Sequence, residues 1–204
     1  MARCVAAFAA AWCLATGVAH AAEIREVTVE REGKRYIMHS VTWFDAPITG
    51  VFDVLTDYDQ FERISSVYAD ARFLDAREAD APVAYTLVKG CVLFFCQSMA
   101  RTERLETNGL ASIRAFADPA RSDFKYSDAT WALSEDRGGT LVVYRVEMQP
   151  GFWVPPLVGP YVMKRQLIKG GRDAVARIEA LAQKSTANTR DFVARGLQGF
   201  ELPE

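Results

Sequence analysis

The stretch FDAPITGVFDVLTDYDQFERI, residues 44–64, decides how the chain folds. Asp45-Ala46-Pro47 breaks the segment before it, and proline suits the first turn of a helix because that turn leaves N–H groups unbonded anyway. Apolar side chains then recur at spacings of three and four, which predicts a helix with one buried face, at Ile48, Val51, Phe52 and Leu55. YDQFERI predicts a second short helix directly after it.

Two extended segments precede this stretch. Residues 24–44 alternate in polarity and carry a turn signal at Glu32-Gly33, which predicts two paired strands. In the second strand, four residues share one parity and therefore one face: Ile37, His39, Val41 and Trp43. If that face points toward the interior, as a ligand site there would require, His39 could contact a ligand head group; the alternative is an ordinary hydrogen-bonded or solvent-exposed histidine.

The region from residue 66 to residue 150 reads as strand throughout. Short segments near 67–77, 83–91, 96–107, 110–117, 124–136 and 139–149 are separated by Gly, Pro and Asn turn signals. Strands joined by short turns predict an antiparallel meander. In the last strand one face is apolar, with Val142, Tyr144, Val146 and Met148.

A single amphipathic helix closes the domain. The Pro-rich connector GFWVPPLVGP (151–160) leads into a helix expected over about residues 160–184. Its apolar positions are Leu167, Gly171, Ala174, Val175, Ile178 and Leu181. Residues 185–204 are mostly polar, and we expect a loosely attached tail there.

The order of these segments resembles the START-like superfamily, also called the helix-grip or SRPBCC group. The resemblance rests on residues 44–64, on WALSEDRGGTLVVYRVEMQP (131–150), and on the connector and closing helix, and it covers about residues 36–184. The superfamily includes polyketide cyclases and lipid-transfer domains, and the similarity is greatest to the coenzyme-Q-binding START-type branch. It implies an α+β fold in which a curved antiparallel sheet wraps around a long C-terminal helix, with two short helices after the first strands.

The resemblance also implies an apolar cavity between the sheet and the closing helix. Small groups at Gly171 and Ala174 could leave volume for a ligand, or they could admit bulky sheet residues such as Trp131, Tyr144 and Met148. The residues expected to line the site are His39, Trp43, Trp131, Tyr144, Val146, Met148, Leu167, Gly171, Ala174, Val175 and Ile178.

The N-terminus predicts export. Residues 1–21 combine one positive charge at Arg3, an uncharged apolar run over 5–18 and the small-x-small pattern Ala19-His20-Ala21, which is typical of a cleaved signal peptide. The apolar run is shorter than the roughly 20 residues of a membrane span. We therefore expect a START-like domain over 22–184, secreted across the inner membrane into the periplasm, with the tail at 185–204.

Two cysteines, Cys91 and Cys96, remain after cleavage. In an oxidising compartment they favour a disulfide, which requires the chain to fold back between them because a straight strand would hold them too far apart. A hairpin with Val92, Leu93, Phe94 and Phe95 at its tip would achieve this. The alternative is a central buried strand with two free thiols. An apolar tip could touch a membrane or form a portal together with Phe152, Trp153 and Leu157, or it could fold under the closing helix.

Composition and motifs exclude several functions. The formal net charge is −2 with no basic stripe, which argues against nucleic-acid binding. Two thiols and one mature histidine are too few for a structural zinc site, and there is no P-loop, dinucleotide fingerprint or H-E-x-x-H motif, so we expect no metal, cofactor or catalytic residue. Four strand arginines are expected mostly on the outer face, although one could point inward: Arg101, Arg104, Arg114 and Arg145.

The sequence thus favours an exported, non-enzymatic protein that binds and transfers an apolar small molecule such as a lipid, an isoprenoid quinone or a polyketide-like compound. One alternative is a cyclase- or dehydratase-type enzyme that uses His39 or a cavity carboxylate as acid and base. Another is a protein-interaction module that presents its apolar loops to a partner. The sequence does not specify an oligomeric state.

Overall fold

The computed structural model describes residues 21–75, 81–92, 95–154 and 159–198. The predicted signal peptide therefore lies almost entirely outside the described residues, as do the hairpin residues Leu93 and Phe94 and the connector residue Leu157. The backbone of Leu167 is described within a helix, but its side chain is not.

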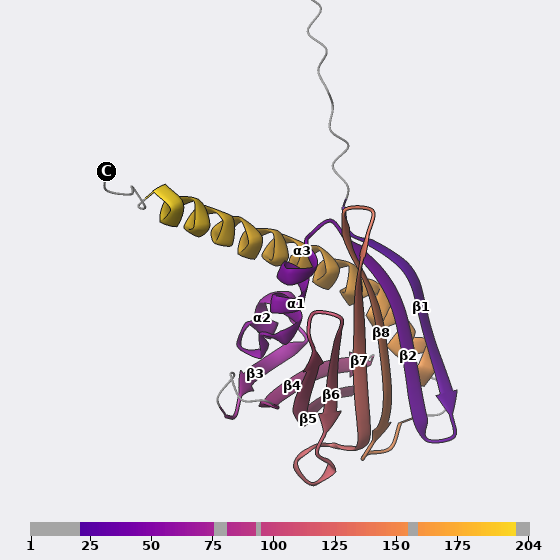
Figure 1. Ribbon diagram of the computed structural model, residues 1–204. Helices are drawn as coiled ribbons and strands as arrows, with labels where there is room; N and C mark the ends of the chain where they lie inside the picture. Colours follow the sequence, from indigo (N-terminus) through magenta and orange to yellow (C-terminus); the bar gives the residue numbers. More distant parts are fainter. Residues whose placement is uncertain (1–20, 76–80, 93–94, 155–158, 199–204) are drawn as a thin grey trace, which may run out of the picture.

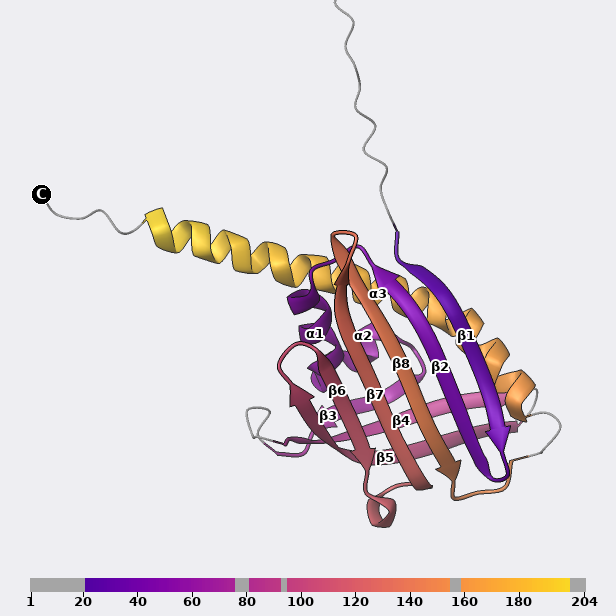
Figure 2. The same ribbon diagram turned by 45° about the vertical axis from the view of Figure 1, so that its right-hand side comes forward.

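One antiparallel sheet and a long helix make up the fold, as the α+β helix-grip prediction requires (Figure 1). The eight strands are arranged in the order β1-β2-β8-β7-β6-β5-β4-β3. The elements are β1 (Glu23–Glu32), β2 (Arg35–Phe44), α1 (Ile48–Thr56), the 3-10 helix η1 (Tyr58–Gln60), α2 (Phe61–Ile64), β3 (Tyr68–Phe73), β4 (Val83–Val92), β5 (Phe95–Asn108), β6 (Ser112–Ala117), the 3-10 helix η2 (Pro119–Arg121), β7 (Phe124–Asp136), β8 (Gly139–Pro150) and α3 (Gly159–Gln198). Figure 2 shows the sheet curving around α3.

Helix α1 forms where the sequence predicted it and packs against α3. Val51 and Leu55 of the predicted apolar stripe are buried, whereas Ile48 and Phe52 are only half-buried. Gly50 lies at the contact, because a Cβ atom there would come within 2.5 Å of the Ala182 carbonyl oxygen. The two helices approach this closely only because residue 50 has no side chain.

The face of β2 that points inward is the opposite of the one expected. Phe44 belongs to the same buried cluster as Ile178 and Ala182 of α3, so the even-numbered residues of β2 face the helix. His39 and Trp43, which have odd numbers, therefore lie on the outer face, together with Ile37 and Val41. Trp43 is nonetheless buried, because its ring packs on Gly139 and its Nε1 donates a hydrogen bond to the Asp136 carbonyl at 2.8 Å.

On β8 the expected face is the inward one. Val142 belongs to the cluster that contains Ile178, and Val146 belongs to a second buried cluster with Met38 of β2. Tyr144 and Met148 pack against that second cluster. The predicted apolar face of the last strand is therefore confirmed.

The closing helix is longer than predicted. It runs from Gly159 through Gln198 rather than ending near residue 184, so much of the expected tail continues α3. Its C-terminal turns extend past the sheet and α1 in both views (Figures 1 and 2). Among the described helices, none combines the length and apolar character needed to cross a bilayer.

The chain reverses direction between the two cysteines. Cys91 of β4 is the register partner of Cys96 of β5, and Val92 is the partner of Phe95, so β4 and β5 form an antiparallel hairpin. The predicted hairpin is confirmed, and the alternative of one continuous central strand is wrong. The disulfide itself stays a prediction.

Candidate ligand-binding site

A charged pair projects from β5 into the interior. Strand alternation turns Arg101, Glu103 and Leu105 toward the helices, since Leu105 lies in the buried cluster that includes Ile178. The side chain of Glu103 is 0% exposed and that of Arg101 is 15% exposed. Register neighbours of Glu103 are Ala84 and Ala117, whose small, buried side chains leave room for a carboxylate.

Tyr58 of η1 completes the contacts of the carboxylate. Its hydroxyl donates a hydrogen bond to Glu103 Oε1 at 2.7 Å. Arg101 Nε lies 2.8 Å from the other oxygen, Oε2, but neither of these two atoms has a well-aligned hydrogen bond within the described part of the chain. The guanidinium therefore neutralises Glu103 by proximity while part of its hydrogen-bonding capacity stays unused.

Two further tyrosines complete the surroundings of Arg101: Tyr68 of β3 and Tyr144 of β8. Burial raises the pKa of each of the three tyrosines around Arg101 (Tyr58, Tyr68 and Tyr144), and for Tyr58 the nearby Glu103 charge raises the pKa further. All three remain neutral phenols at physiological pH. Burial lowers the pKa of Arg101, but attraction to Glu103 and then to Tyr58 outweighs it, so the net pKa is raised and the guanidinium stays charged.

Other polar atoms on the inward face lack partners. Thr86 Oγ1, Ser127 Oγ and Tyr36 Oη are buried, and none has a hydrogen-bond partner among the described residues. Thr86 lies opposite Arg101 in the register, whereas Tyr36 and Ser127 both lie opposite Met148. Because buried polar groups are normally hydrogen-bonded, these atoms are available to bound water or to polar groups of another molecule.

The rest of the interior wall is apolar and incompletely covered. Trp131 and Tyr144 stack with ring centroids 4.9 Å apart, and both are only half-buried although they face inward. On α3, Ala174 and Val175 pack against the core and are also half-buried. A tightly filled core would bury these side chains completely, so all four keep some surface that another molecule could contact.

Most of the predicted lining residues come together here. Trp131, Tyr144, Val146, Met148, Ala174, Val175 and Ile178 face the interior, and Ile178 is buried within the packed core. Gly171 faces β1, where an added Cβ would meet Ile24 Cδ1 at 3.8 Å.

His39 and Trp43 do not belong to this group, which corrects the expectation for both. His39 lies opposite Arg145 on the outer face, with Nδ1 3.8 Å from Glu26 Oε1. A role for His39 as the acid or base of an interior reaction is excluded by this position.

The predicted portal residues are only partly described. Phe152 is half-buried and lines a small pocket with Phe124 and Gln97, whereas the side chain of Trp153 is 76% exposed. Val92 and Phe95 pair at the hairpin end, but their side chains lie outside the described residues.

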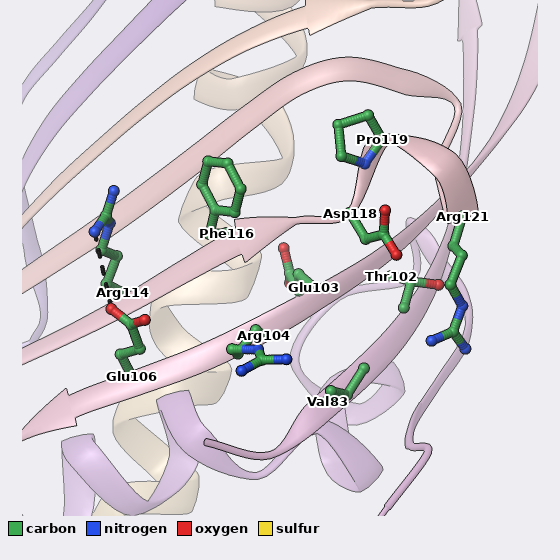
Figure 3. A pocket seen from close by; sticks show the side chains of 10 residues that line it. All are labelled: Val83, Thr102, Glu103, Arg104, Glu106, Arg114, Phe116, Asp118, Pro119 and Arg121. Atoms are coloured by element: carbon green, nitrogen blue, oxygen red, sulfur yellow. Dashed lines mark ion pairs between the residues drawn. The ribbon is translucent and has the colours of Figure 1, made fainter. Parts of the chain in front are cut away.

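A pocket of about 520 Å³ lies on the outer face of β4, β5 and β6 (Figure 3). Arg114, which lines it, is engaged by Asp128 at 3.0 and 2.7 Å and by Glu106 at 3.8 Å. Opposite charges largely neutralise each other there, and Glu103 of the interior cluster is also among the residues that line this pocket. Within the described residues, no group of His, Cys, Asp and Glu could hold a metal ion.

Comparison with solved structures assigns the fold. A STAR-related lipid transfer protein from Xanthomonas axonopodis has a TM-score of 0.57 at 14% identity, covering 74% of this chain and 98% of that one. Human STARD10 has a TM-score of 0.58 at 11% identity, covering 83% of this chain and 78% of that one. The Zhui aromatase/cyclase from Streptomyces sp. R1128 has a TM-score of 0.52 at 15% identity, covering 76% of this chain and 96% of that one.

These likenesses show that the chain has the helix-grip fold that these START-type and aromatase/cyclase proteins share. No protein-family model matches the sequence, and no curated relative is detected.

Proposed function

We propose that the protein binds and transfers an apolar small molecule that carries an oxygen-containing head group, held between the sheet and α3. The observation that carries this proposal is the Arg101–Glu103 pair, buried with Tyr58 inside an otherwise apolar wall. A buried ion pair contributes little net stability compared with apolar side chains of similar size. Its presence at this place is therefore better explained by recognition of a polar group.

The chemistry of the cluster selects the head group. Arg101 and the neutral phenol of Tyr144 are hydrogen-bond donors, so the complementary group is an acceptor such as a carbonyl, quinone or phosphate oxygen. The apolar body of the ligand would contact Trp131, Met148 and Ala174, which are only partly buried. Burying about 300 Å² of apolar ligand surface would contribute roughly 7 kcal/mol of binding free energy. Lipids, isoprenoid quinones and polyketide-like molecules all fit this description.

The names of the structural neighbours support the same ligand class, since they include a lipid transfer protein and an aromatase/cyclase. The signal-peptide pattern of residues 1–21 supports export to the periplasm. There, the register partners Cys91 and Cys96 would form a disulfide across the end of the β4–β5 hairpin.

The test is to identify molecules that co-purify with the exported chain, using organic extraction and mass spectrometry. Ala174→Phe fills the interior from α3, whereas Ala176→Phe adds the same ring to an exposed position on the same helix and serves as the matched control. We expect an apolar, oxygen-bearing compound in the native protein and in the control, and its loss from Ala174→Phe. An empty native protein, or equal retention by the two variants, would contradict the proposal.

A cyclase- or dehydratase-type activity is the second candidate function. It is favoured by the placement of a carboxylate and a phenol, Glu103 and Tyr58, in the interior. Incubation of the protein with its co-purified compound and with unsaturated or uncyclised analogues separates the two functions. A carrier returns each compound unchanged, whereas an enzyme yields a product whose formation depends on Glu103.

A further inference from the structure

The first turns of α3 carry an exposed stripe of apolar and cationic side chains. With 3.6 residues per turn, five exposed positions fall along one side of the helix: Tyr161, Lys164, Arg165, Ile168 and Arg172. These five residues are called the α3 basic stripe. Tyr161 is 66% exposed and Ile168 is 41% exposed, which is unusual for large apolar side chains on a helix that packs against a domain.

Packing of α3 explains why the stripe is left uncovered. Ile178 and Ala182 are buried against the core and Ala174 packs beside them, so these core contacts come from the middle turns of the helix, whereas the five stripe residues of its first turns are exposed. None of the three cations of the stripe forms an ion pair with a carboxylate in the described part of the chain. The stripe is thus a local concentration of unpaired positive charge on a chain whose net charge is −2.

A further exposed aromatic ring precedes the helix in the sequence. Trp153 of the connector is 76% exposed. Tryptophan and tyrosine rings are enriched where a protein meets the head-group region of a bilayer, and lysine and arginine beside them attract anionic lipids. The combination is typical of a helix that lies on a membrane surface rather than of one that crosses it.

The stripe also lies near one end of the proposed site. In Figure 2 the first turn of α3 lies beside the ends of β4 and β5 that meet at the hairpin, and Figure 1 agrees. A membrane held against this end would meet the protein where the sheet and the helix begin to enclose the interior.

We propose that the α3 basic stripe, together with Trp153, docks the protein on an anionic lipid surface. The inference rests on the proposed function in one respect: docking would place the interior next to the membrane that supplies or receives the ligand. Docking itself needs no ligand and can be measured separately. The positive charge of the stripe complements anionic phospholipids. A second copy of this chain, with its small net negative charge, would attract the stripe more weakly.

Vesicle co-sedimentation of the mature chain tests this inference. We expect binding to vesicles of phosphatidylcholine mixed with phosphatidylglycerol, weak binding to phosphatidylcholine alone, and loss of binding as salt is added. Because each cation near an anionic surface contributes about fivefold to partitioning, the triple variant Lys164→Glu/Arg165→Glu/Arg172→Glu should bind at least about 100-fold more weakly.

The matched control makes the same change in charge elsewhere. Arg63→Glu/Arg104→Glu/Arg121→Glu reverses three exposed cations on α2, β5 and η2 and should retain most of the binding. Trp153→Ser should weaken binding to both kinds of vesicle, because it removes an aromatic ring that inserts among the lipid head groups and leaves the charge of the protein unchanged.

Three results would overturn the inference: no preference for the anionic vesicles, equal loss in the two triple variants, or self-association in solution that the α3 triple variant abolishes. The last result would identify a second copy as the partner. Ligand extraction from the α3 triple variant distinguishes this proposal from the proposed function, because loss of docking with normal ligand content leaves the proposed function intact.

Discussion

Replacement of Arg101 by leucine is expected to destabilise the protein strongly. The guanidinium lies 2.8 Å from a carboxylate whose side chain is 0% exposed, so its removal leaves Glu103 as a buried, uncompensated charge. Breaking a buried pair in this way costs about 3–5 kcal/mol of unfolding free energy. For a domain of this size, that loss corresponds to a fall in Tm of about 10 °C or more.

A double-mutant cycle with Glu103→Gln isolates the charge interaction. The glutamine keeps an acceptor for the Tyr58 hydroxyl but carries no charge, so Arg101→Leu/Glu103→Gln removes both charges together. We expect the double variant to recover about 2 kcal/mol or more relative to the sum of the single variants. Urea denaturation of ligand-free protein is the assay, because a bound ligand would add stability of its own.

The outer face supplies the control for this cycle. Arg114→Leu breaks a pair with Asp128 in which the arginine side chain is 49% exposed, and its cost should stay near 1 kcal/mol or below. The reasoning fails if Arg101→Leu costs no more than Arg114→Leu, or if the effects at Arg101 and Glu103 simply add.

Four other outcomes are expected. Burial raises the pKa of the three tyrosines around Arg101 in the folded state, so the stability that they contribute is complete below their unfolded-state pKa of about 10 and should fall as the pH rises above it. Urea denaturation at a series of pH values, with phenolate absorbance, would show this fall, and a free energy of unfolding that does not change with pH would contradict it. Gly50→Ala should cost about 1–3 kcal/mol in urea denaturation, because its Cβ would meet the Ala182 carbonyl oxygen at 2.5 Å, and a neutral effect would show that the helices are not so close. Thiol titration of the exported chain should detect no free cysteine, and Cys91→Ser/Cys96→Ser should lose about 2 kcal/mol of stability. Reactive thiols in the wild-type chain after it is unfolded in urea would exclude the disulfide. His39→Ala should leave the amount of co-purified ligand unchanged, since His39 lies on the outer face. A clear reduction in bound ligand would show that His39 belongs to the binding site.

Local sequence patterns predict much of the fold. The Pro47 boundary, the α1 stripe and the apolar face of β8 depend on spacings of a few residues, and the structure places all of them as expected. The hairpin between Cys91 and Cys96 is also correctly predicted, because two thiols close in sequence can pair only where the chain reverses.

The face of β2 was not decidable by parity alone. Ile37, Val41 and Trp43 are as apolar as Met38 and Phe44, so both faces of the strand satisfy an alternating pattern. Burial of Trp43 depends on Gly139 and the Asp136 carbonyl, which lie far away in sequence. The correct choice required knowledge of the neighbouring strand.

The sequence allowed one strand arginine to point inward, but it could not single out Arg101 or predict the pair with Glu103, for a similar reason. On β5, Arg101 and Glu103 face inward while Arg104 and Glu106 face outward, so charge alone does not reveal which side is buried. The hydroxyl that satisfies Glu103 comes from Tyr58, 45 residues earlier. The one available signal was Leu105, which shares its parity with the inward pair.

The length of α3 was underestimated because the residues after 184 are mostly polar. Polar composition indicates exposure and does not by itself end a helix. No Gly or Pro occurs between residues 185 and 195, so this stretch contains no residue that would stop the helix, which the structure describes through Gln198.

A crystal structure of the exported chain with its co-purified compound is the most direct test of the central claim. We expect electron density for an apolar molecule between α3 and the inward face of the sheet, against Trp131 and Met148, with an oxygen atom within hydrogen-bonding distance of Arg101 or Tyr144. An interior filled by the protein's own side chains, with Arg101 satisfied entirely by protein atoms, would contradict ligand carriage and leave only the fold established.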